Sequence, residues 1–220
     1  MNHLLNKIVN FHGYLNASPY SIIQSKVRKI DKDISDFFAF RLGDFETIFI
    51  AENNLSLLTG DAVECKHIFN FFDKTGCFCG KFEINDINFH YRLNVNSNIT
   101  NGVLFGGFTH HIQYSKELLE NYKTLLADIS FQHRGYSGYR RTKGDGYSYV
   151  HGNFGGMYID KKHKIKSIAR FRGKHTYTSQ FTIKPDYSYD FIFTNPLSKN
   201  TSIKFFLAEN KSIRTLNQKY

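Results

Sequence analysis

Short runs of Phe, Ile, Val, Tyr and Thr, broken by Gly, Asn and Asp, follow one another along most of the chain. This pattern is typical of strands joined by turns. The predicted strands are 37–42, 45–51, 63–72, 77–84, 87–94, 103–109, 147–150, 154–160, 165–172, 176–184, 188–194 and 201–208. We therefore expect a mainly β protein, with α+β as the alternative. Its architecture would be an antiparallel β-sandwich or barrel-like sheet of about ten to twelve short strands.

Two segments have helical periodicity instead. The first spans about 19–36, where Ser18 is a favoured N-cap and Pro19 is tolerated at the first helical position. The second spans 115–129, where Ser115 can cap the helix and apolar residues recur every three or four positions. The pattern therefore predicts two helices.

Turn residues predict two hairpins, one through Asn85-Asp86 and one through 160–164. The chain has no internal repeat and no linker-like tract, so a single domain over residues 1–220 is expected. The Gly-rich span 135–156 is the one candidate for a long loop.

Charge changes the picture because it is concentrated in one region. The chain has 29 Lys and Arg against 19 Asp and Glu, a net charge of +10. Residues 133–184 alone contain 12 basic and 2 acidic residues, which accounts for the whole excess. A concentrated basic region attracts anionic ligands, whereas the alternative is a solvated basic surface without a ligand.

Within this region, residues 133–158 combine Arg, Tyr and Gly at high density. Guanidinium groups bind phosphate or carboxylate, glycine lets backbone amides approach an anion, and tyrosine rings stack on bases or sugars. The expected function is binding of an anionic, phosphate- or carboxylate-bearing polymer or sugar: a glycan, a sugar-nucleotide or a single-stranded nucleic acid. The expected ligand-binding residues are Arg134, Tyr136, Tyr139, Arg140, Arg141, Lys143, Tyr149, Asn153, Arg170 and Arg172. The alternative is a β-hairpin whose Tyr rings pack on the sheet and whose Arg side chains point to water.

Histidines suggest a second class of function. The candidate general acids and bases are His110, His111, His133 and His151. They would serve a hydrolase, nuclease or transferase acting on a phosphodiester or glycosidic bond. Whether the protein is an enzyme stays open at this point, as does a third class, a structural subunit that pairs through its aromatic surface.

The three cysteines, Cys65, Cys77 and Cys79, are an odd number, which favours a reducing, cytoplasmic location. Cys65, Cys77 and Cys79 could form a zinc set with His67, but their spacing within Phe-rich strands favours core packing, so no metal is expected. The common nucleotide and metal motifs are absent from the sequence, and no cofactor is expected. No apolar run reaches the length of a membrane span, and no signal peptide is expected.

Overall fold

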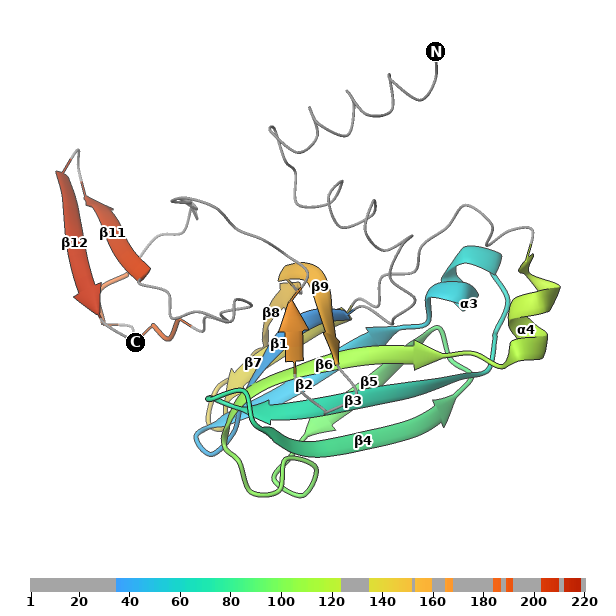
Figure 1. The fold of residues 1–220 in the computed structure, drawn as a ribbon. Coiled ribbons are helices and arrows are strands. Elements are labelled where there is room, and N and C mark those ends of the chain that lie inside the picture. Colours follow the sequence, from blue (N-terminus) through green and yellow to red (C-terminus); the bar gives the residue numbers. More distant parts are fainter. Residues whose placement is uncertain are drawn as a thin grey trace, which may run out of the picture.

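Twelve strands and two short helices make up the part of the chain that the computed structural model describes (Figure 1). That part comprises residues 35–123, 135–151, 153–159, 165–167, 184–186, 189–191, 203–209 and 212–218. All strand pairs in these ranges are antiparallel. The predicted mainly β, antiparallel architecture is therefore confirmed.

The strands form two main sheets. Sheet A has six strands in the order β10 (Ile165–Ser167), β9 (Asn153–Ile159), β1 (Ser35–Arg41), β6 (Phe105–Gln113), β3 (Cys65–Asp73) and β4 (Phe78–Asp86). Sheet B has four, in the order β5 (His90–Val95), β2 (Phe45–Glu52), β7 (Gly135–Arg141) and β8 (Ser148–His151). A separate hairpin pairs β11 (Ile203–Glu209) with β12 (Ser212–Gln218).

Aromatic side chains fill the space between sheets A and B. Successive side chains of a strand point to opposite faces, so alternate residues of β1, β2, β3 and β6 turn inward. The inward phenylalanines are Phe38, Phe40, Phe49, Phe69, Phe71 and Phe108. The ring of Phe38 in sheet A lies 4.5 Å from that of Phe49 in sheet B, edge to face. The two sheets therefore pack as a sandwich around a phenylalanine core.

The chain changes sheets through short connections. Residues 42–44 join β1 of sheet A to β2 of sheet B. Gly43 in this turn has a φ of 87°, which glycine adopts without the steric cost that a Cβ brings. A single residue separates β8 of sheet B from β9 of sheet A. These tight connections link the two sheets covalently at two places.

The helices are shorter than the predicted ones. Helix α4 (Lys116–Asn121) lies inside the predicted 115–129 segment, and the Ser115 side chain accepts a hydrogen bond from the backbone N–H of Leu118, as a cap should. Residues 124–129 lie outside the described residues. For the predicted helix 19–36, residues 19–34 also lie outside them, and Ser35 and Asp36 belong to β1.

Helix α3 (Asn54–Thr59) has no counterpart among the predicted elements. The Asn53 side chain caps it by accepting from the N–H of Ser56, and Gly60 ends it in the left-handed conformation. Helices α3 and α4 lie at the same end of the sandwich (Figure 1). No helix in the part of the chain seen here is long and apolar enough to cross a membrane.

Two predictions about connections differ from the structure. The hairpin through Asn85-Asp86 is wrong, because β4 continues to Asp86 and pairs with β3, while β5 pairs with β2 in the other sheet. The Gly-rich span 135–156 is no loop: β7 and β8 pair with each other, so its first part is a hairpin. The pairing of β9 with β10 confirms the hairpin predicted around 160–164.

Among the predicted strands, 176–184 lies outside the described residues except for Lys184, and residues 189–191 of the predicted strand 188–194 are not in a strand. Strands β7 and β12 were not among the predictions. In β7 two glycines interrupt the run of β-favouring residues, which weakens the local signal.

Candidate ligand-binding face

The outer face of sheet B can be read from strand register. Phe49 points into the core, so its neighbours Ile48 and Ile50 point outward. Ile48 pairs with Asn94 on one side and Gly138 on the other. We call the outward positions the aromatic face: Glu46, Ile48, Ile50 and Glu52 of β2, His90, Arg92 and Asn94 of β5, Tyr136, Gly138 and Arg140 of β7, and Tyr149 and His151 of β8.

Tyr149 packs in the space that Gly138 leaves open. A Cβ added at Gly138 would lie 2.8 Å from Cγ1 of Ile48 and 2.9 Å from Cε1 of Tyr149. The ring of Tyr149 therefore needs a glycine opposite it in order to approach Ile48. Tyr149 nevertheless stays 52% exposed, so the packed ring still presents a large surface to solvent.

An aromatic pair lies farther along the same two strands, β7 and β8. Tyr136 and His151 are register partners, and their rings meet edge to face with centroids 4.9 Å apart. Tyr136 is 36% exposed and His151 is exposed. Tyr136 and Tyr149 together give the aromatic face two ring surfaces held by strands instead of by a loop.

Tyr147, in the turn before β8, joins the aromatic pair to a charged cluster. Its hydroxyl donates to Oε2 of Glu46 at 2.9 Å, and Nη2 of Arg140 donates to the same oxygen at 2.5 Å. The guanidinium of Arg140 lies 4.7 Å from the centre of the Tyr147 ring, and that of Arg92 lies 5.9 Å from it. Two cations therefore flank one tyrosine, within the range of cation–π attraction.

The electrostatics of Glu46 follow from these contacts. The hydrogen bond from Arg140, and then that from Tyr147, hold the pKa of the Glu46 carboxyl below its ordinary value. The pKa of Arg140 is raised by the same pairing with Glu46. Both groups are therefore charged at neutral pH, and the negative charge of Glu46 partly compensates the positive charge of Arg140.

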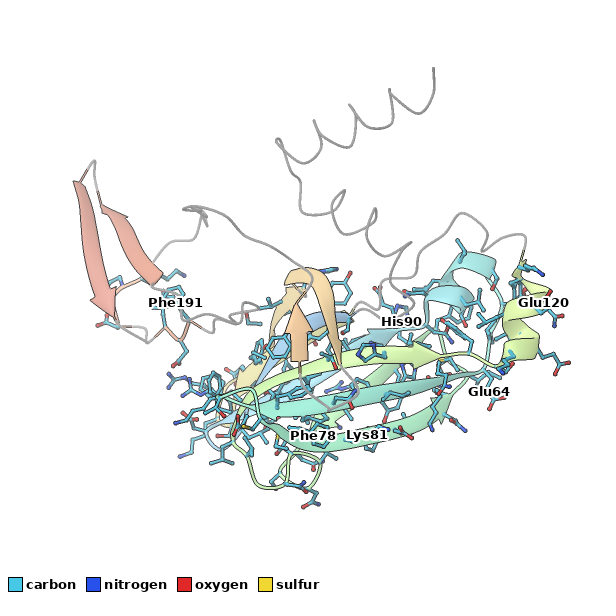
Figure 2. All side chains as sticks on the ribbon, viewed as in Figure 1. Glu64, Phe78, Lys81, His90, Glu120 and Phe191 are labelled. Carbon is cyan, nitrogen blue, oxygen red and sulfur yellow. The ribbon has the colours of Figure 1, made fainter. Side chains whose placement is uncertain are left out.

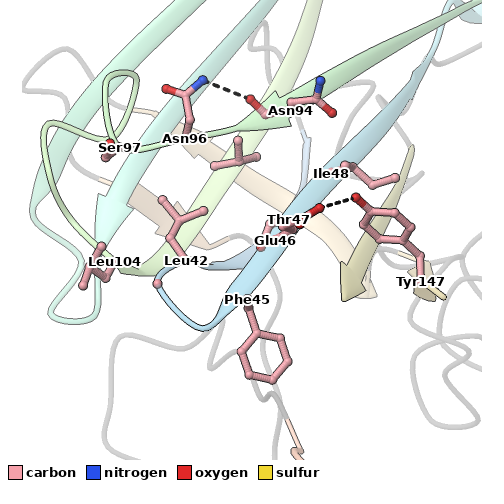
Figure 3. A pocket seen from close by; sticks show the side chains of 12 residues that line it. Leu42, Phe45, Glu46, Thr47, Ile48, Asn94, Asn96, Ser97, Leu104 and Tyr147 are labelled. Carbon is pink, nitrogen blue, oxygen red and sulfur yellow. Dashed lines mark hydrogen bonds between the residues drawn. The ribbon is translucent and has the colours of Figure 1, made fainter. Parts of the chain in front are cut away.

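A hollow of about 420 Å³ opens where β5 ends at Val95 (Figure 3). On one side lie Glu46, Ile48 and Tyr147, and on the other the chain that leaves β5. The remaining lining residues are Leu42, Gly43, Phe45, Thr47, Asn94, Val95, Asn96, Ser97 and Leu104. The lining is mainly apolar with a few polar groups, as in sites that bind small ligands.

A second cluster of arginines lies at the end of the sandwich, beside Phe45. Arg41 and Arg141 both pair with the carboxylate of Asp190, the former at 3.2 Å. The two guanidiniums also lie 4.1 Å and 5.5 Å from the centre of the Phe45 ring. The hydrogen bond from Arg141 lowers the pKa of Asp190, which keeps this carboxylate ionised. Lys143, in the adjacent turn, is exposed.

The predicted binding residues thus divide into several environments. Tyr136, Arg140 and Tyr149 meet on the aromatic face, while Arg141 lies at the end of the sandwich. Tyr139 points inward and donates its hydroxyl hydrogen to the carbonyl of Ala39 at 2.8 Å. Asn153 belongs to β9 of sheet A, opposite Phe37. Arg134, Arg170 and Arg172 lie outside the described residues, as does His133.

The remaining three predicted histidines lie on three different surfaces. His110 points into the core, where the centre of its ring lies 4.8 Å from that of Phe69 and 5.3 Å from that of Phe49. His111, the next residue, faces the outer side of sheet A and is also buried. His151 is exposed on the outer side of sheet B. The structure does not bring these three imidazoles together.

A buried row of polar contacts instead runs along the inner face of sheet A, through Cys65 and His67 of β3 and His110 of β6. Nδ1 of His67 lies 2.9 Å from Nε2 of His110, and Nε2 of His67 lies 3.4 Å from Sγ of Cys65. Burial raises the pKa of the Cys65 thiol to about 12 and lowers that of His67 to about 4. A protonated thiol can donate to Nε2, which leaves the Nδ1–H of His67 to donate to His110.

The contacts among Cys65, His67 and His110 are not arranged to hold a metal ion, because they use nitrogens on opposite sides of the His67 ring. Cys77 is exposed and Cys79 is half-buried, and neither extends this row of contacts. No group of three or more metal-ligating side chains occurs in the region covered by the structure.

The predicted binding residues did not include Glu46, Arg92, Asn94 or Tyr147. The first three come from β2 and β5, outside the basic region 133–184, and strand pairing alone places β2 beside β7 and β5 beside β2. Tyr147 is part of the Tyr-rich span, so composition could have found it. Comparisons with models of known protein families, with curated protein sequences and with solved structures found no match.

Proposed function

We propose that the aromatic face binds an anionic, phosphate- or carboxylate-bearing polymer or sugar. The observation that carries this proposal is the exposed Tyr149 ring, fixed against Ile48 by Gly138 and close to Tyr147 with its two flanking arginines. Rigid aromatic surfaces provide stacking, and nearby guanidiniums provide charge.

Each group has a separate part in this proposal. Tyr136 and Tyr149 offer ring surfaces to a base or a sugar. Arg92 is exposed and lies near the Tyr147 ring, so its N–H groups can reach an anion from solvent. Arg140 is held by Glu46 and contributes mainly by orienting Tyr147 and the carboxylate.

The charge distribution supports an anionic ligand. Residues 133–184 contain twelve basic residues, of which the described side chains are Arg140, Arg141, Lys143 and Lys184. The other eight belong to the same charged region of the sequence. Binding should therefore weaken as salt increases.

The test is binding of fluorescent heparin and of a single-stranded oligonucleotide, measured by anisotropy from 50 to 200 mM NaCl. The Tyr136→Ala/Tyr149→Ala and Arg92→Ala/Arg140→Ala variants should each weaken binding by about tenfold or more. A matched control is Lys66→Ala/Lys81→Ala, which removes two cations from sheet A; Lys81 lies on the edge strand β4 (Figure 2).

The proposal fails if neither probe binds. It also fails if binding is independent of salt, or if the control variant weakens binding as much as the two site variants do. Thermal unfolding of every variant separates lost binding from lost folding.

A further inference from the structure

The hollow at the end of β5 adjoins the aromatic face through Glu46, Ile48 and Asn94, which belong to both (Figure 3). We propose that this hollow binds one sugar ring of a glycan, so that the ligand of the aromatic face is a carbohydrate and not a nucleic acid. The inference rests on the proposed function, because it names the ligand class of the same site.

The Glu46 carboxylate is open to a ligand on one side. Both of its hydrogen bonds, from Arg140 and Tyr147, go to Oε2. Among the described residues Oε1 has no hydrogen-bond donor, and the side chain is 39% exposed beside the hollow. An ionised oxygen with spare lone pairs is a strong acceptor for ligand hydroxyl groups. Vicinal hydroxyls are the donors that a sugar ring carries in abundance.

Polar and apolar groups lie together around that oxygen. Asn94 lines the hollow and is exposed, and a side-chain amide can both donate to and accept from hydroxyl groups. The ring of Tyr147 provides apolar area, on which the C–H face of a pyranose can pack. A carboxylate, an amide and an aromatic ring within one hollow match the alternating polar and apolar faces of a sugar.

The charge balance of the aromatic face also favours a sugar over a nucleic acid. The aromatic face carries two arginines, Arg92 and Arg140, and two acidic residues, Glu46 and Glu52. A phosphodiester backbone brings one negative charge per nucleotide and is normally bound by an excess of cations. Glu46 would repel a phosphate placed in the hollow. An acidic sugar has fewer charges, and its hydroxyls can face Glu46 while its acidic group faces Arg92.

The test compares a panel of immobilised pyranose glycans, including uronic-acid, sulfated and phosphorylated ones, with single-stranded oligonucleotides. The decisive variant is Glu46→Gln, which removes the charge and keeps the shape of the side chain. Its control is Glu83→Gln on sheet A, where the carboxylate is likewise held by two donors, Lys66 and Lys81. Asn94→Ala is a second variant that leaves the Arg140 pairing intact.

Glycan binding that falls about tenfold in Glu46→Gln and in Asn94→Ala, but not in Glu83→Gln, would support the inference. Binding only to oligonucleotides, with affinity unchanged or raised in Glu46→Gln, would overturn it and leave the proposed function standing. Glycan binding that ignores both hollow variants would also overturn it. Failure of every probe to bind would overturn the proposed function as well.

Discussion

His67 and His110 face each other at the centre of the sandwich, with Nδ1 of the first 2.9 Å from Nε2 of the second. Both side chains are fully buried, and their rings are nearly parallel, with centroids 5.1 Å apart. Protonation of both imidazoles would place two hydrogens in this contact and two charges in an aromatic core. The folded protein therefore requires at least one of them to be neutral.

This pair predicts a loss of stability in mild acid. The pKa of His67 falls to about 4 in the folded chain because burial disfavours the charged form, whereas the unfolded value is close to 6.5. Between these pH values the unfolded chain binds a proton that the folded chain does not. Stability should thus decrease as pH falls from 6.5 to 4, by up to about 1.4 kcal/mol per pH unit for this group.

The measurement is urea unfolding at several pH values. Buried His111, whose pKa is also lowered to about 4, should add to the wild-type slope. His67→Gln should reduce the slope, while His90→Gln, at the exposed start of β5 (Figure 2), should not. Equal slopes in wild type and His67→Gln would show that this histidine does not control the acid sensitivity.

Gly138→Ala should disturb the aromatic face. The new methyl would lie 2.8 Å from Ile48 and 2.9 Å from Tyr149, which is closer than side chains pack, so the Tyr149 ring must move outward. Overpacking of this kind costs about 1–3 kcal/mol. Gly146→Ala is the matched control, since nothing lies within 4 Å of its added Cβ. Urea unfolding and probe binding should both change in the first variant only.

The phenylalanine core should depend strongly on Phe49. Its fully buried ring contacts those of Phe38, Phe69, Phe108 and His110, so it links the two sheets. Phe49→Ala should lower the free energy of unfolding by about 3–5 kcal/mol. Ile87→Ala, at a position that is 56% exposed, should change it by less than about 0.5 kcal/mol. Similar effects of both substitutions would contradict the packing described here.

Local sequence patterns predicted most strands, because alternation of apolar and polar residues directly reflects one buried face. They did not predict which strands become neighbours. Asn85-Asp86 has good turn residues, yet the following strand pairs with β2, and nothing local distinguishes a hairpin from a crossing between sheets. The same limit applies to the site. Glu46 and Arg140 are 94 residues apart, and their contact follows from the pairing of β2 with β7.

The charge excess illustrates this limit most clearly. Composition indicated a cluster of arginines ready to bind anions, but Arg140 pairs with Glu46 and Arg141 with Asp190, both supplied by segments outside 133–158. Tyr139 was predicted to stack on a ligand, and its hydroxyl instead bonds to the backbone of β1. Residue type alone does not separate a tyrosine that faces solvent from one that faces the opposite sheet.

Asp190 should compete with anionic ligands for the arginines at the end of the sandwich. It pairs with Arg41 and Arg141, and those pairings lower its pKa, so it stays ionised at neutral pH. Asp190→Asn would remove one carboxylate partner from both guanidiniums and raise the local charge by one, while Arg41 keeps its pairing with Asp44. Affinity for heparin should therefore increase at 50 mM NaCl, and the gain should shrink at 200 mM as salt screens it. Stability should change by less than about 1 kcal/mol, because the pairs lie at the surface. The control is Asp61→Asn, which neutralises an exposed carboxylate before β3. If it raises heparin affinity equally, the effect is a general one of net charge and is not specific to Arg41 and Arg141.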